Sequence, residues 1–334
     1  MGCSSVVWGD RPGRAPRLAS RAAARPAPPT IDAMDTAALS LSPSPASGAE
    51  HAHVLTLACT NRKGIVHAVT GALLGVEADI TESQQYGSPD TGDFFMRVEF
   101  MTPAVREDIE QALAPVREEF GMRMGLWDAA HRMRTLVMCS KDGHTLNDLL
   151  FQQRAGTLPI EIPVVVSNHL DLQPLASFYG VPFIHVPVSK DPSSRDSKEA
   201  AEDRLRDLIA QFDIELVVLA RYMQILSDEL CRDLAGMAIN IHHSFLPSFK
   251  GARPYHQAHE RGVKLIGATA HYVTADLDEG PIIAQSVQPV THAQTAADFV
   301  ARGRDVEGST LAQAVRWHAQ HRVLADGRRT VVFS

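Results

Sequence analysis

The C-terminal part of the chain, from residue 134 to about residue 332, alternates short apolar runs with segments of helical periodicity. The apolar runs lie at residues 136–139, 163–166, 183–186 and 215–219. Runs this short and this apolar are typical of strands buried on both faces, as in parallel sheets. Leu146, Leu149 and Leu150 recur at helical spacing between the first two runs. This alternation predicts an α/β fold with a doubly wound, mostly parallel, Rossmann-like open sheet.

Residues 54 to about 126 show a different order of elements. Strands are predicted at residues 54–59, 80–86, 94–101 and 122–126, with one helical segment after the first strand and another after the third. The order βαββαβ predicts a ferredoxin-like fold. We therefore expect three parts, namely an extension at 1–50, a small domain at 51–130 and the doubly wound domain at 131–334.

Three predicted helices have candidate capping residues at their N-termini. Asn61 can cap the first helix of the small domain. Thr102 and Pro103 are expected to open its second helix as cap and first-turn proline. In the doubly wound domain, Asp196 or Ser197 is the candidate cap of the helix before residue 215.

The composition excludes several classes of function. The chain has 334 residues and a net charge of −7 at pH 7, without a block of Lys or Arg. We therefore expect no nucleic-acid or membrane partner. Cys3, Cys59, Cys139 and Cys231 are widely spaced, which argues against a disulfide framework or a thiolate metal site and favours the cytoplasm. No stretch approaches the roughly 18 apolar residues of a membrane span.

The first fifty residues are rich in Ala, Pro, Arg and Ser. Such a segment buries too little apolar surface to offset the entropy of ordering it, so we expect a disordered extension. Its arginines between residues 11 and 25, without an acid among them, resemble an organelle transit peptide. The alternative is a segment translated from an upstream start, with Met34 as the natural first residue.

A polar cluster follows an apolar strand and opens a loop containing Pro and Gly. Asn240 and His242 are two residues apart and point to the same face of that strand, with His243 on the other face. Open α/β sheets bind ligands at this edge. A second polar segment, 276–281, contains Asp278.

The three residue types suit attack by water on a carbonyl group. Asn240 can donate a hydrogen bond to an oxyanion, and His242 can act as general acid or electrostatic partner. Asp278 can position a water and lower the cost of protonating His242. The alternative is a structural histidine beside an aspartate that caps a loop.

Other segments carry weaker signals. Met223, Gln224, Ile225 and Leu226 follow the fourth apolar run and are candidates for a flat apolar pocket, with core packing as the alternative. The loop at 140–147 contains one glycine and an acid, so it predicts neither a dinucleotide site nor a phosphate site.

A metal site is the weakest hypothesis for this chain. The candidate ligands are His243, His256, His259 and His271. His256 and His259 lie three residues apart on a predicted helix, but a zinc site needs three or four converging ligands. We predict no metal.

The run from Asn240 to Gly251, together with residues 277–281, resembles the folate-dependent formyltransferase family. The resemblance assigns the family's catalytic roles to Asn240, His242 and Asp278, and its folate-binding loop to residues 223–226. The implied substrate is a folate, with no prosthetic group.

The segment 61–66 is similar to a loop of ACT domains, with Asn61 where an aspartate is usual. This resemblance implies an amino-acid effector site at Asn61, Gly64 and Ile65, and assembly into a homo-oligomer. A purely dimerising role is the alternative.

Within the formyltransferase family, an N-terminal ACT domain is typical of members that hydrolyse 10-formyltetrahydrofolate to formate and tetrahydrofolate. Such members supply formate and balance one-carbon folate pools for purine synthesis. The first alternative is formyl transfer to a small amine such as glycinamide ribonucleotide, which needs an anion cradle that residues 140–147 lack. The second is a folate sensor without turnover.

Overall fold

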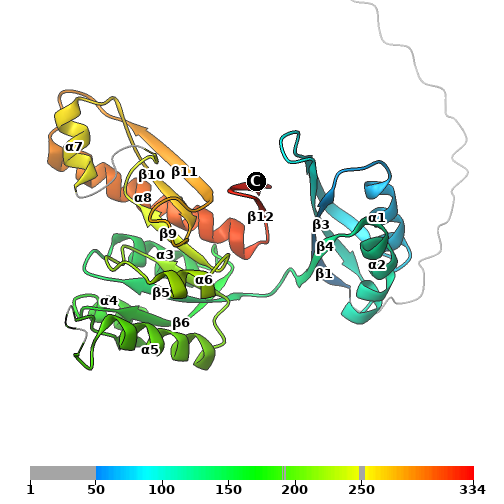
Figure 1. Cartoon of the computed structure of the whole chain (residues 1–334), viewed down its shortest axis with the longest axis horizontal. Helices are drawn as coiled ribbons and strands as arrows, with labels where there is room; N and C mark the ends of the chain where they lie inside the picture. The colour runs from blue at the N-terminus through cyan, green and yellow to red at the C-terminus, as the bar shows by residue number, and fades with distance from the viewer. Residues whose placement is uncertain (1–49, 190, 192, 248–252) are drawn as a thin grey trace, which may run out of the picture. The chain divides into compact units, whose positions relative to one another are not determined.

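The computed structural model describes residues 50–189, 191, 193–247 and 253–334 (Figure 1). The expected disordered extension lies almost wholly outside the described residues, as do positions 248–252 of the polar run that begins at Asn240.

The N-terminal part forms a four-stranded antiparallel sheet in the order β2-β3-β1-β4. Its elements are β1 (His51–Thr60), α1 (Ile65–Leu74), β2 (Asp79–Gly87), β3 (Asp93–Thr102), α2 (Arg106–Phe120) and β4 (Arg123–Asp128). Both helices cover one face of the sheet (Figure 1). The predicted βαββαβ order and ferredoxin-like fold are confirmed, and the bounds of each predicted strand agree to within three residues.

Two of the predicted caps in this part are wrong. Helix α1 begins at Ile65, so Gly64, which has a φ of 96°, is its N-cap in place of Asn61. Helix α2 begins at Arg106, three residues after Pro103. Thr102 is the last residue of β3, and its hydroxyl donates to the Val76 carbonyl and accepts from the Ala104 amide, so it is not available to cap a helix.

The C-terminal part is built on a seven-stranded sheet in the order β11-β10-β9-β8-β5-β6-β7. The five strands from β9 to β7 are parallel to one another, whereas β10 pairs antiparallel with both β9 and β11. The strands are β5 (Met133–Cys139), β6 (Ile160–Ser167), β7 (Phe183–His185), β8 (Leu216–Leu219), β9 (Ala238–His242), β10 (Leu265–Tyr272) and β11 (Ile282–Pro289). The helices are α3 (His144–Arg154), α4 (Gln173–Phe178), α5 (Lys198–Gln211), α6 (Asp228–Asp233), α7 (Pro254–Arg261) and α8 (Ala296–Ala319). The predicted mostly parallel, doubly wound sheet is confirmed.

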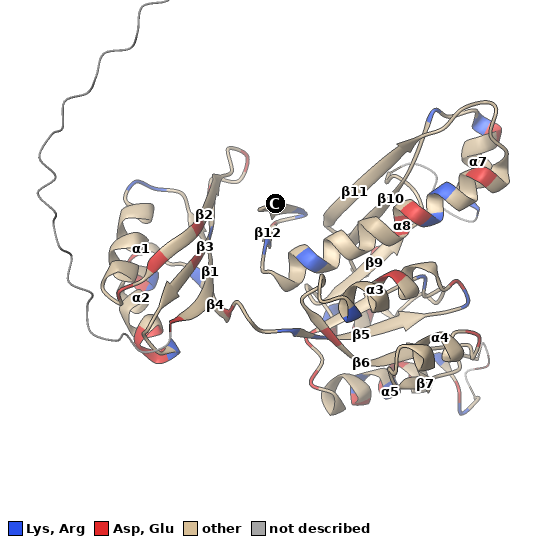
Figure 2. Cartoon of the chain, turned by 180° about the vertical axis from the view of Figure 1, so that it is seen from behind, with Lys and Arg blue, Asp and Glu red and all other residues tan. Residues whose placement is uncertain are grey.

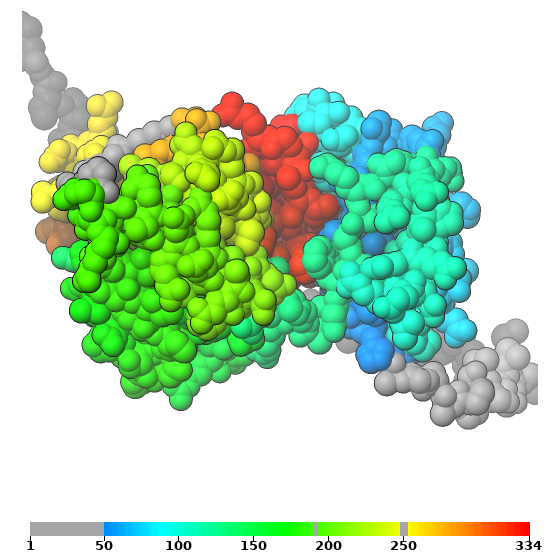
Figure 3. Space-filling model, turned by 60° about the horizontal axis from the view of Figure 1, so that its bottom comes forward, coloured from blue at the N-terminus to red at the C-terminus, as the bar shows by residue number. Residues whose placement is uncertain are grey.

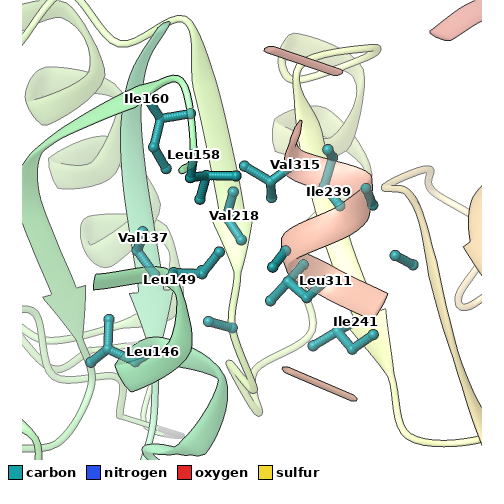
Figure 4. Packing of buried hydrophobic residues seen from close by; sticks show 14 of the residues in the cluster. Val137, Leu146, Leu149, Leu158, Ile160, Val218, Ile239, Ile241, Leu311 and Val315 are labelled. Atoms are coloured by element: carbon teal, nitrogen blue, oxygen red, sulfur yellow. The ribbon is translucent and has the colours of Figure 1, made fainter. Parts of the chain in front are cut away.

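Alternation along each strand divides the core between the two faces of this sheet. Val137 and Val218 pack with α3 and α8, whereas the neighbouring Leu136 and Val217 pack with α5 and α6. Figure 4 shows Leu311 and Val315 of α8 against Ile239 and Ile241 of β9. Each fully buried aliphatic side chain contributes about 1.5–3 kcal/mol, so these two clusters fix the sheet between its helices.

The strand order reverses between β5 and β8, and this reversal positions the site. Neighbouring connections run in opposite directions there, so the loops that follow β5 and β8 diverge and leave a crevice at the carboxyl edge of the sheet. In the space-filling view, the green to yellow-green segments from β5 to α6 form one close-packed body (Figure 3).

The sequence analysis did not predict a last hairpin, formed by β12 (Val323–Asp326) and β13 (Arg329–Val332). In this part of the chain, acidic and basic residues are interspersed along α7 and α8 (Figure 2). Among the described residues, none of the helices is both long and apolar enough to span a membrane.

Candidate active site

The carboxyl end of β9 presents two polar side chains on one face because strand residues alternate. Ile239 and Ile241 point into the core beneath α8, which leaves Asn240 and His242 on the opposite face. Both line a cavity of about 670 Å³ at this edge of the sheet. That volume lies in the usual range for small-molecule sites.

Asp278 reaches the same cavity from the loop between β10 and β11. Its carboxylate Oδ1 lies 3.2 Å from Nδ1 of His242. The residue has a φ of 57°, a left-handed conformation that Asp tolerates better than most residues. Gly280 holds the loop close to β10, since a Cβ there would stand 1.8 Å from the Tyr272 carbonyl oxygen.

The contact between Asp278 and His242 keeps Asp278 ionised and fixes a proton on Nδ1 of His242. Burial tends to raise the pKa of the Asp278 carboxyl, but the hydrogen bond from His242 and the histidines around it lower that pKa below its ordinary value. Because a carboxylate only accepts, Nδ1 of His242 carries a proton. Nε2 of His242 is buried and has no hydrogen-bond partner among the described residues.

His271, which the sequence analysis treated only as a possible metal ligand, orients Asn240. Burial lowers the pKa of His271, so its imidazole is neutral near pH 7. Its Nδ1 lies 2.9 Å from the Tyr272 carbonyl oxygen and must donate to it, which makes Nε2 an acceptor. Nδ2 of Asn240, 3.2 Å away, therefore donates one N–H to His271 and keeps its second N–H for another acceptor.

The loop after β8 forms an apolar wall of the cavity. Met223, Gln224, Ile225 and Leu226 all line it. Met223 and Ile225 are 59% and 64% exposed, so they do not pack in the core. Leu226 is buried in the cluster beneath α5 and α6, and for this residue core packing also holds.

A buried glutamate on α8 carries the opposite wall, and the sequence analysis missed it. Glu307 accepts hydrogen bonds from Nε2 of His144 at 2.9 Å and from the Tyr255 hydroxyl at 2.8 Å. Nε of Arg221 lies 3.5 Å away. Burial tends to raise the pKa of Glu307, but these donors and the Arg221 charge lower it below its ordinary value. The one available signal was an acid at a core-facing position of an amphipathic helix.

His243 follows His242 directly and also lines the cavity. Its ring centroid is 5.0 Å from that of His242, and the two ring planes are inclined at 67°. Burial and the nearby Arg221 and His242 lower the pKa of His243 to about 4.

The remaining candidates lie apart from this cavity or at its rim. Nε2 of His259 binds the Gln294 carbonyl, and within the described residues no three His, Cys, Asp or Glu are grouped to hold a metal ion. In the N-terminal part, Asn61 and Gly64 are exposed in a loop, whereas the Ile65 side chain is buried in the core beneath them.

Comparison with known proteins first defines the class of the catalytic part. A family model described as Formyl transferase matches residues 133–315. These residues include the whole seven-stranded sheet and most of α8.

Full-length relatives then define the family more closely. Formyltetrahydrofolate deformylase of Corynebacterium sp. (strain P-1) is 51% identical over 283 residues, which cover 84% of this chain and 97% of that protein. The deformylase of Bacillus subtilis (strain 168) is 43% identical and is covered to 93%. The crystal structure of formyltetrahydrofolate deformylase from Burkholderia mallei ATCC 23344 matches with a TM-score of 0.80 and 47% identity, over 85% of this chain and 100% of that chain. The chain belongs to the formyltetrahydrofolate deformylase family.

Proposed function

We propose that this chain hydrolyses 10-formyltetrahydrofolate to formate and tetrahydrofolate, with no prosthetic group. One observation carries the proposal: Asn240, His242 and Asp278, from two separate segments, meet in one cavity beside an exposed apolar loop. The names of the relatives support the same reaction. In cells, this reaction supplies formate and balances one-carbon folate pools for purine synthesis.

The pterin of the substrate packs on the loop from Met223 to Leu226, whose exposed apolar side chains suit a flat heterocycle. This pose brings the N10-formyl group toward β9. Two donors face the formyl oxygen, namely the second N–H of Asn240 and the Nε2–H that His242 carries when its ring is protonated beside the Asp278 carboxylate.

Hydrolysis then proceeds through a tetrahedral intermediate. Asp278 orients a water, whose oxygen forms a bond to the formyl carbon while the oxyanion is stabilised by His242 and Asn240. The bond from that carbon to N10 breaks, and N10 takes a proton that came from the water. Formic acid leaves and loses its remaining acidic proton to solvent.

Transfer to glycinamide ribonucleotide is the second candidate, since a glycinamide ribonucleotide transformylase from Symbiobacterium toebii matches at a TM-score of 0.57 and 32% identity over 63% of this chain. Asp142 in the loop after β5 argues against a phosphorylated acceptor. Its carboxylate lines the cavity 3.5 Å from Arg221 and 3.7 Å from Arg304, so it occupies the cations that a phosphate would need.

The test is formate release from 10-formyltetrahydrofolate by the purified chain without an added acceptor. Release at a rate that glycinamide ribonucleotide does not raise supports hydrolysis. Formyl glycinamide ribonucleotide formed in place of formate supports the transferase. Binding of the folate without either product would leave a sensor, in contradiction of the proposal.

We further propose that residues 51–130 form a regulatory ACT domain and residues 131–334 the catalytic domain. The exposed Asn61 and Gly64 loop supports effector binding there through backbone groups and the Asn61 side chain. The effector is a small amino acid, and the chain assembles as a homo-oligomer. Repeating the formate assay with methionine and with glycine tests this proposal, because a rate that responds to neither argues for a purely structural domain.

We place the protein in the cytoplasm, without nucleic-acid or membrane partners. Cys59, Cys139 and Cys231 are free and buried, as expected in a reducing compartment. Fractionation of cells that express the tagged chain tests this location.

A further inference from the structure

We infer that Arg221 is a specificity-determining residue, which keeps amines out of the cavity and so leaves water as the acceptor of the formyl group. This inference rests on the proposed hydrolysis and addresses how the site selects its acceptor. Arg221 lies between β8 and the apolar loop at 223–226, and it lines the cavity. Its side chain is 13% exposed and contacts α8 and the loop after β5, on the wall opposite that apolar loop.

The backbone of Arg221 has a conformation that an arginine adopts only at a cost. Its φ is 63°, in the left-handed region where a Cβ is crowded and glycine is the usual residue. Residues held in this region cluster at binding and active sites. Glycine would make the same turn without strain, so the turn alone does not account for an arginine here. The side chain is the reason for the residue.

That side chain pairs with the carboxylates that an amine would need. Within the described residues, three carboxylates line the cavity, those of Asp142, Asp278 and Glu307. Asp278 is bonded to His242. The Arg221 guanidinium lies 3.5 Å from each of the other two, through Nη2 to Asp142 and through Nε to Glu307. Carboxylates are the strongest acceptors for an N–H group or an ammonium ion, and all three are already paired.

The positive charge of Arg221 also balances this wall of the cavity. Glu307 accepts hydrogen bonds from His144 and Tyr255, but Arg221 is the arginine beside it. Arg304 contacts Asp142 instead, at 3.7 Å. Without Arg221, a buried carboxylate would present uncompensated negative charge to the cavity, and the space of the guanidinium would be open. Both changes favour entry of an amine.

One donor of Arg221 further favours water over an amine. Its Nε is buried and makes no hydrogen bond within the described part of the chain, although Glu307 lies 3.5 Å away. A buried donor without an acceptor is costly, and a water molecule satisfies it by accepting. A neutral amine has one lone pair, which it must direct at the formyl carbon. It therefore offers only N–H donors to this group and leaves it unsatisfied.

The test is how Arg221→Gly divides the formyl group between water and added glycinamide, an amine without a phosphate. In the transfer, the amine nitrogen bonds to the formyl carbon, the bond from that carbon to N10 breaks, and an amine proton passes to N10. The readout is the ratio of formylglycinamide to formate, corrected for the reaction without enzyme. A merely structural loss of active enzyme lowers both products and leaves this ratio unchanged. We expect Arg221→Gly to raise it at least about tenfold, the usual effect of one discriminating contact in a pocket.

Two controls separate Arg221 from the charges around it. Arg221→Lys keeps a cation beside both carboxylates, and Arg304→Ala removes the exposed arginine that contacts only Asp142. Both ratios should stay near the wild-type value. Because glycine suits a φ of 63°, Arg221→Gly should fold, which thermal unfolding checks. Arg221→Asn, which also tolerates this backbone, repeats the test if it does not.

A higher ratio in Arg221→Gly alone supports the inference. A ratio within about threefold of the wild type, less than one pocket contact contributes, overturns it. An equal rise in either control also overturns it, since any change of the wall would then admit the amine. A folded Arg221→Gly that gives neither product overturns it as well, because Arg221 would then serve the reaction itself. Failure of the wild-type chain to release formate would instead refute the proposed function.

Discussion

Asp278→Asn is the sharpest single perturbation of the proposed site. The substitution keeps the size of the side chain, and Asn tolerates the left-handed backbone at a φ of 57° as well as Asp does. It removes the negative charge that stands 3.2 Å from Nδ1 of His242. The loop geometry should therefore survive while the electrostatics change.

The distance sets the size of the expected effect. When the doubly protonated His242 imidazole faces the oxyanion, a carboxylate 3.2 Å from its Nδ1 stabilises the positive charge by about 5 kcal/mol at an effective dielectric constant of about 20. The amide oxygen of Asn retains part of that interaction, and removing a half-buried carboxylate recovers some desolvation cost. A net loss of about 3–4 kcal/mol corresponds to a fall of roughly 10²–10³-fold in kcat.

The assay is formate release at saturating 10-formyltetrahydrofolate, with Asp276→Asn as the matched control. Asp276 lies on the same loop, but it is exposed and does not line the cavity. We expect the control to keep wild-type activity and both variants to unfold near the wild-type temperature. If Asp278→Asn kept its rate within threefold of wild type, the proposed partnership with His242 would be refuted.

Three further predictions concern other parts of the same domain. Asn240→Ala removes one oxyanion donor, so steady-state kinetics should show kcat lower by about 10²–10³-fold with a small change in KM; an effect confined to KM would contradict the role. In α8, a Cβ at Gly303 would lie 2.1 Å from the Tyr255 ring, whereas the nearest heavy atom to one at Gly308 is 3.5 Å away. In urea unfolding, Gly303→Ala should therefore destabilise the chain and Gly308→Ala should stabilise it by about 0.5–1 kcal/mol, and equal effects would refute the packing argument. Burial lowers the pKa of His318 from 6.5 to about 4, so the unfolded chain binds the proton first as the pH falls. The stabilisation from the neutral, buried His318 is complete above pH 6.5 and is lost as the pH falls toward 4. Over this range the free energy of unfolding of His318→Gln should fall by roughly 3 kcal/mol less than that of the wild type. The same pH dependence of the free energy of unfolding in both proteins would contradict this prediction.

Local patterns in the sequence predicted the layers of the fold because each depends on residues close together. The four apolar runs became β5, β6, β7 and β8, and Ser197 caps α5 by accepting from the Ala200 amide, as the sequence indicated. The missed hairpin of β12 and β13 also had a local signal. Gly327 and Arg328 form the two-residue turn between the paired Asp326 and Arg329, and Gly327 at its first position has a positive φ of 63°.

The parts of the site that the sequence did not reveal depend on residues far apart in the chain. His144 follows β5, Arg221 follows β8, Tyr255 is on α7 and Glu307 is on α8, and no spacing rule relates these positions. The wrong prediction of a cap at Thr102 has a similar origin. The Thr102 hydroxyl donates to the carbonyl of Val76, which lies in the connection between α1 and β2. Tertiary contacts decide which of several groups a polar side chain bonds, and the pattern of a single sequence does not contain those contacts.

The proton on Nδ1 of the buried His271 has a consequence for the neighbouring amide. While Nε2 accepts, the Asn240 side chain must turn its nitrogen toward the imidazole. A second proton on that ring would make Nε2 a donor, and the Asn240 amide would rotate by half a turn to offer its oxygen instead. Acidification would thus reverse the polarity that the site presents to a carbonyl, without moving any strand or helix.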